Sequence, residues 1–100
     1  MRQYRVLVIE KEEALGARIV GALEEAGYAV VRTVGALDGL KKFYETYPDL
    51  IIVGREAPMV SGEEPCLPIR QASHQPIIVL GSNEDAAEIL ELGADAYMTK

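Results

Sequence analysis

Short apolar runs alternate with helical patterns along most of this chain. Four runs are strand-length and rich in Val and Ile, and a shorter fifth lies near the end: Val6–Ile9, Ala29–Val34, Leu50–Val53, Ile77–Leu80 and Ala96–Met98. Three of them are continuously apolar rather than alternating, which is typical of strands covered on both faces in a parallel sheet. Arg32 interrupts the second run, so we expect that strand to lie nearer an edge.

Two segments between these runs repeat apolar residues at three- and four-residue steps, the pattern of an amphipathic helix. The apolar stripe of the first, Glu12–Ala26, is Leu15, Ile19, Leu23 and Ala26. The stripe of the second, Ala36–Tyr47, is Leu40, Phe43, Tyr44 and Tyr47. Gly27 and Pro48 are natural stops for these helices. The pattern therefore predicts that Tyr44 and Tyr47 pack in the core.

The later connections are less regular. Pro65 and Pro68 remove helical donors, so we expect a distorted opening and a short helix over Ile69–Ala72. Ala86–Leu92, ended by Gly93, predicts a helix of barely two turns. The alternation of strands and helices predicts an α/β domain over residues 1–100, with a doubly wound, five-stranded parallel sheet.

Composition fits one small globular domain, with 49% hydrophobic and 26% charged residues. The net charge of 10 − 16 = −6 argues against direct nucleic-acid binding, which needs clustered Lys and Arg. Cys66 is the only cysteine and His74 the only histidine, which excludes an internal disulfide and multi-histidine metal sites. No apolar run has the length of a membrane span or a signal peptide, so we expect a cytoplasmic protein that does not bind membranes.

The order and spacing of several segments resemble the receiver domain of bacterial two-component response regulators. The matching segments are Val6–Glu13, Pro48–Val53, Pro58 with Gly62, Pro76–Leu80 and Gly93–Lys100. The family is a flavodoxin-like (CheY-like) module of five βα units that accepts a phosphoryl group from a histidine kinase. The resemblance covers nearly the whole chain. Since the chain stops after the fifth strand, we expect the last covering helix to be missing, one sheet face to be open to association, and an output domain to follow in the parent protein.

Two positions of the family's phosphorylation pocket are altered here. The family has an aspartate nucleophile directly after the third strand, and this chain has Gly54. The acidic pair that holds Mg²⁺ in the family is represented by Glu10 and Lys11. A glycine cannot accept a phosphoryl group, and an ammonium cannot ligate Mg²⁺. We expect Glu10 either to pair with Lys11 or Lys100 in the old pocket or to be a solvated loop charge.

The switch positions of the family are partly retained. Gly81 stands where the family has a hydroxyl residue, and Ser82, one position later, is expected to cap the next helix. Tyr97 and Lys100 match the aromatic residue and the lysine of the family. We interpret Tyr97 as a half-buried side chain, and Lys100 equally as a remnant of the switch or as a surface lysine.

These departures predict a degenerate receiver that is not an enzyme and needs no cofactor or metal. By resemblance it would act through protein contacts, on its own output domain or a partner, in regulating transcription. The fourth helix and fifth strand would be its surface for a possible homodimer. One alternative is a functional receiver phosphorylated at a non-standard residue such as Glu56. Another is a small flavodoxin-like domain that binds an anion or a nucleotide, although no phosphate-binding glycine motif supports it.

Overall fold

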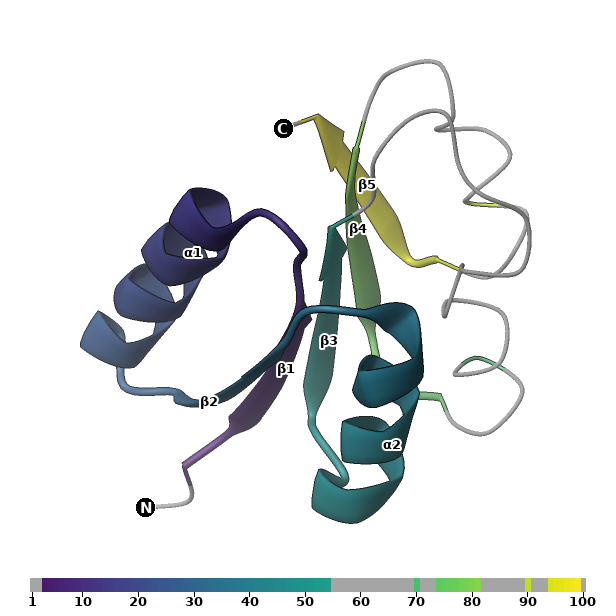
Figure 1. Cartoon of the computed structure of the whole chain (residues 1–100). Coiled ribbons are helices and arrows are strands. Elements are labelled where there is room, and N and C mark those ends of the chain that lie inside the picture. Colours follow the sequence, from purple (N-terminus) through teal and green to yellow (C-terminus); the bar gives the residue numbers. More distant parts are fainter. Residues whose placement is uncertain (1–2, 55–69, 71–73, 82–89, 91–93, 100) are drawn as a thin grey trace.

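The computed structural model describes residues 3–54, 70, 74–81, 90 and 94–99 (Figure 1). Its five strands are β1 (Arg5–Ile9), β2 (Ala29–Thr33), β3 (Leu50–Gly54), β4 (Ile77–Gly81) and β5 (Ala96–Thr99). They pair in parallel in the order β2-β1-β3-β4-β5. The predicted α/β class, the five strands and the edge position of the Arg32 strand are confirmed. The helices predicted within 61–73 and 86–92 lie largely outside the described residues.

Two helices cover opposite faces of the sheet, α1 (Glu13–Glu25) and α2 (Ala36–Thr46). On one face Val6, Val8 and Ile52 pack with Ile19 and Leu23 of α1. Alternate residues of the same strands form the other face, as the two-residue period of a strand requires. That face packs against Phe43 of α2, and its buried strand residues are Leu7, Ile9, Ile51, Val53, Ile77 and Val79.

Gly27 ends α1 as the sequence predicts. Its φ is +99°, in the left-handed region that glycine adopts without a steric penalty. The Gly27 amide donates to the Glu24 carbonyl, and the Tyr28 amide donates to the Leu23 carbonyl, each at 3.0 Å. This pair of bonds is a Schellman cap, which satisfies carbonyls that the helix leaves free.

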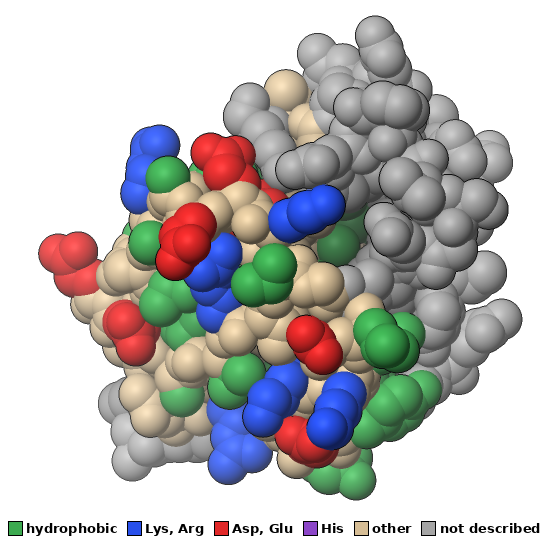
Figure 2. Space-filling view, in the orientation of Figure 1, with side chains coloured by type: hydrophobic (Ala, Val, Ile, Leu, Met, Phe, Trp, Pro, Cys, Tyr) green, Lys and Arg blue, Asp and Glu red, His purple; other side chains and the backbone are tan. Residues whose placement is uncertain are grey.

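The prediction that Tyr44 and Tyr47 pack in the core is wrong. Tyr44 is 55% and Tyr47 75% exposed, whereas Phe43 is only 5% exposed. Each helical step turns about 100°, so Tyr44 points away from the sheet when Phe43 faces it, and its ring meets Phe43 edge-on at 5.2 Å. Tyr47 lies beyond the last residue of α2 with a φ of 48°. Apolar side chains therefore lie among charged ones on the surface in Figure 2.

Neither α1 nor α2, the helices that the structure describes in full, has the length and apolar character needed to cross a membrane.

Two aspartates extend the strand pairing at the amino ends of the sheet. The Asp49 amide donates to the Arg5 carbonyl at 2.8 Å, and its Oδ2 accepts from the Arg5 amide at 2.9 Å. Asp95 repeats this arrangement with Ile77, at 2.9 and 2.8 Å. Asp95 Oδ2 also pairs with Arg70. Each aspartate therefore satisfies both polar main-chain atoms of a strand residue next to it.

We expect Asp95→Ala to lower the free energy of unfolding by about 1–2 kcal/mol. The substitution leaves the Ile77 amide, which is partly buried, without its acceptor. Urea denaturation monitored by circular dichroism measures the change. Glu25→Ala is the matched control, because Glu25 is exposed and such substitutions ordinarily change stability by no more than about 0.5 kcal/mol. Equal stabilities for both variants would contradict a structural role for Asp95.

Candidate site at the carboxyl ends of the strands

The residues singled out from the sequence gather where the parallel strands end. Ile9 of β1 is paired with Val53 of β3, so Glu10 and Gly54 follow directly after paired residues. Gly54 is in turn paired with Leu80, and Gly81 with Thr99. This edge of a doubly wound sheet is where such folds bind their ligands.

Glu10 is a buried acidic residue, with only 1% of its surface exposed. Its amide donates to the Thr33 carbonyl at 3.0 Å, which continues the β1–β2 pairing beyond the strands. Its carboxylate oxygen Oε2 accepts from the amide of Glu12 at 3.4 Å. The interpretation of Glu10 as a solvated loop charge is therefore wrong.

The Glu10 carboxylate occupies the space directly over Gly54. A Cβ atom on Gly54 would lie 2.5 Å from Cδ and 2.6 Å from Oε2 of Glu10, closer than side-chain carbons approach other atoms. Gly54 is not among the residues with positive φ, so backbone conformation does not require a glycine there. The Glu10 carboxylate thus occupies space that a side chain at position 54 would need, and it can lie there because residue 54 is a glycine.

Lys11 does not contribute to this pocket as an ion-pair partner. Its side chain is exposed at the start of the loop after β1. Among the described residues no ion pair joins Lys11 to Glu10, so that version of the predicted pair is wrong. Lys100, the other expected partner, lies outside the described residues.

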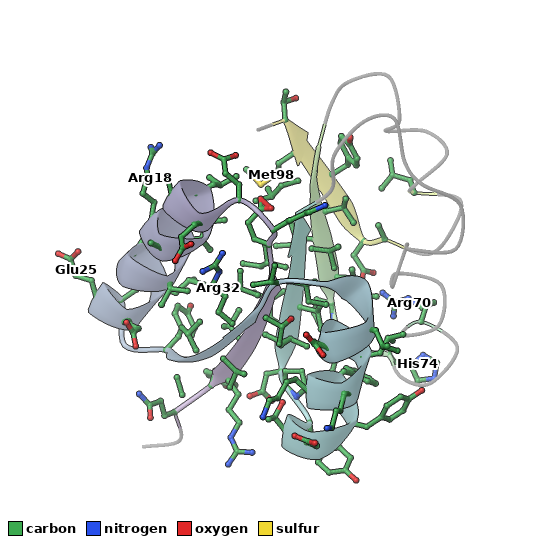
Figure 3. All side chains as sticks on the ribbon, in the orientation of Figure 1. Arg18, Glu25, Arg32, Arg70, His74 and Met98 are labelled. Carbon is green, nitrogen blue, oxygen red and sulfur yellow. The ribbon has the colours of Figure 1, made fainter. Side chains whose placement is uncertain are left out.

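The remaining predicted positions are divided between described and undescribed residues. Gly81 is buried at the end of β4, and Tyr97 is half-buried in β5 against the core on the α2 face, as predicted. His74 is exposed (Figure 3). The other predicted residues, Ser82, Lys100, Glu56 and Cys66, lie outside the described part of the chain.

Arg32 is part of this region, although the sequence indicated only that it interrupts a strand. Its Nη2 donates to the Glu10 carbonyl at 2.9 Å and to the Glu12 carbonyl at 3.3 Å. The side chain lies between α1 and the sheet (Figure 3). The sequence feature that could have revealed this role is the arginine within an otherwise apolar strand, because a guanidinium placed there needs hydrogen-bond acceptors close by.

The residues present do not fit the Mg²⁺ ion that the receiver family implies. Magnesium requires several oxygen ligands in near-octahedral geometry. Glu10 supplies a carboxylate, but Lys11 supplies a cation and Gly54 supplies no ligand. Within the described segments, no three His, Cys, Asp or Glu side chains converge on one point.

A five-stranded doubly wound sheet that brings Glu10 and Gly54 together after β1 and β3 is the architecture of a receiver domain. The model of the response regulator receiver domain family matches residues 6–100. The chain belongs to this family, whose members are signalling modules of two-component response regulators.

Curated relatives support the same family. The transcriptional regulatory protein YrkP of Bacillus subtilis is 38% identical over 100 residues, which are 97% of this chain and 43% of that protein. AfsQ1, a transcriptional regulatory protein of Streptomyces coelicolor, is 35% identical over 98 residues, 95% of this chain and 44% of that protein. The chain thus spans less than half the length of these relatives.

Solved structures agree on the fold. A response regulator receiver domain protein from Clostridium thermocellum superposes with a TM-score of 0.85 at 27% identity, covering 97% of this chain and 82% of that one. The chemotaxis response regulator CheY4 of Vibrio cholerae gives the same TM-score at 23% identity, covering 99% of this chain and 88% of that one. At that identity the similarity concerns the fold alone.

Proposed function

We propose that this receiver domain signals without being phosphorylated, through contacts with protein. The observation that carries the proposal is the Glu10 carboxylate, which fills the space over Gly54. In the family this is the place of the phosphoacceptor aspartate. A buried carboxylate in that place supplies negative charge where the family would otherwise receive a phosphoryl group.

The chemistry of phosphoryl transfer supports this proposal. The transfer requires a nucleophile in line with the leaving group, together with cations that neutralise the developing charge. Gly54 provides no nucleophile, and the exposed Lys11 replaces a metal ligand. The pocket therefore lacks two of the groups that the family uses together.

The proposed output is a protein contact that regulates transcription. Relatives are named transcriptional regulatory proteins and are more than twice the length of this chain, so we propose an output domain in the parent protein. By resemblance to the family, we propose the fourth helix and the fifth strand as the surface for the output domain or a homodimer. The acidic net charge argues against direct nucleic-acid binding by this segment.

The proposal predicts that the chain stays unmodified when it is incubated with Mg²⁺ and acetyl phosphate. Intact-mass spectrometry of the full chain checks this. The Lys11→Asp/Gly54→Asp variant, which has carboxylates at the two positions where the family has them, serves as the positive control. A Mg²⁺-dependent, base-labile phosphoryl adduct on the unmodified chain would overturn the proposal. Peptide mapping of such an adduct to Glu56 would instead establish the alternative of a non-standard acceptor.

A further inference from the structure

Arg32 is the charged side chain that the edge strand β2 directs toward α1. Its Nη2 binds two carbonyls of the loop that follows β1, those of Glu10 and Glu12, at 2.9 and 3.3 Å. A guanidinium donates stronger hydrogen bonds than a neutral group does. One side chain therefore ties both ends of the segment 10–12 to β2.

Gly16 provides the space that the guanidinium occupies. A Cβ atom on Gly16 would lie 2.5 Å from Cζ and 2.6 Å from Nη2 of Arg32. Gly16 is buried within α1, where a helix ordinarily favours alanine over glycine. The helix thus carries a less favourable residue at the point where Arg32 packs.

The buried Nε atom of Arg32 shows that packing alone does not explain this residue. Nε has no hydrogen-bond partner within the described part of the chain, and a buried donor without an acceptor is destabilising. An apolar side chain of similar length would fill the same space without that penalty. The bonds from Nη2 to the loop are what an apolar residue could not supply.

Both polar main-chain atoms of Glu10 are held by successive residues of β2. The Glu10 amide donates to the Thr33 carbonyl at 3.0 Å, and its carbonyl accepts from Arg32. With the backbone fixed in this way, the side chain is directed into the space over Gly54. We propose that Arg32 is a positioning residue that keeps the Glu10 carboxylate in the pocket, with Gly16 giving it room. This inference rests on the proposed function and names what keeps the pocket filled.

A double-mutant cycle on the full chain tests this role. Gly54→Ala pushes against the Glu10 carboxylate, so its effect on stability depends on how firmly that carboxylate is held. In an Arg32→Met background we expect the loss of stability from Gly54→Ala to fall by about half or more, because residues in one contact network are not additive. Arg18→Met, an exposed substitution on α1 (Figure 3), should leave the loss unchanged. An equal loss in all three backgrounds would overturn the proposal.

Hydrogen exchange gives a second measurement that does not require removal of Arg32. Gly16→Ala keeps the arginine, but its Cβ would overlap the guanidinium, which we expect to move away from the loop. We expect the Glu12 amide, which donates to Glu10 Oε2, to exchange about tenfold faster in Gly16→Ala than in the unmodified chain. Arg32→Lys, which retains a donor, should give a smaller increase than Arg32→Met. Unchanged exchange in Gly16→Ala would overturn the proposal even if Arg32→Met fails to fold.

The outcomes separate this inference from the proposed function. A phosphoryl adduct on the unmodified chain would overturn the proposed function and leave the cycle between Arg32 and Gly54 unaffected. If the effects of Arg32→Met and Gly54→Ala on stability are additive, Arg32 does not position Glu10. The proposed function, which mass spectrometry tests, is not affected by that outcome.

Discussion

Gly54→Ala is expected to lower the free energy of unfolding by about 1–3 kcal/mol, the usual effect of overpacking, because Gly54 is only partly buried but the carboxylate that its Cβ would meet is fully buried. Alanine is ordinarily more favourable than glycine in a strand by about 0.5–1 kcal/mol. Here its Cβ would overlap the Glu10 carboxylate, at 2.5 Å from Cδ. The buried carboxylate must then leave its place or displace its neighbours. Urea denaturation with a fixed m-value measures the change.

Two comparisons make this prediction specific to Glu10. In a Glu10→Ala background, Gly54→Ala should be neutral or slightly stabilising, because the obstructing carboxylate is gone. Gly21→Ala is a matched control on α1, where a Cβ atom would meet nothing within 4 Å apart from the adjoining backbone of its own helix. It should stabilise the chain by about 0.5–1 kcal/mol. If Gly54→Ala destabilises the Glu10→Ala protein equally, the carboxylate does not fill the space over Gly54.

Lys11→Asp combined with Gly54→Asp is expected to create a Mg²⁺ site and a phosphoryl acceptor. The Cβ that Gly54→Asp introduces takes the space over position 54, so the Glu10 carboxylate must turn aside from it. The three carboxylates of residues 10, 11 and 54 then form the oxygen-rich set that Mg²⁺ requires. We expect the variant to bind Mg²⁺ at least about tenfold more tightly than the unmodified chain, a difference of about 1.4 kcal/mol. The unmodified chain should bind Mg²⁺ only nonspecifically. Isothermal titration calorimetry measures both affinities, and acetyl phosphate should now give a phosphoryl adduct.

Repulsion among the introduced carboxylates makes stability a further indicator of the rebuilt site. Without metal, three close negative charges destabilise the folded state. Bound Mg²⁺ relieves that repulsion, so the melting temperature of the double variant should rise with Mg²⁺ concentration. Lys11→Asp alone and Gly54→Asp alone each lack one ligand and should show weaker responses. Tight Mg²⁺ binding by the unmodified chain would show that Lys11 and Gly54 do not disable the pocket.

The local pattern of the sequence determined the elements and their order. Continuous runs of Val and Ile form strands wherever both faces are covered, and the positive φ that ends α1 requires Gly27 or a residue like it. That position 54 offers no nucleophilic side chain was also readable, because glycine has none in any fold. These features depend on residues close together in the chain.

Only the tertiary structure decided what occupies the space over Gly54. Glu10 and Gly54 are far apart in sequence, and their contact exists because β1 and β3 pair in a particular register. Arg32 reaches Glu10 across 22 residues, through space that Gly16 leaves open in a helix. The exposure of Tyr44 followed in the same way from which side of α2 faces the sheet, the side that carries Phe43. Periodicity fixes which residues of one element share a face. Contacts between side chains of different elements depend on how those elements pack, and no local sequence pattern encodes that packing.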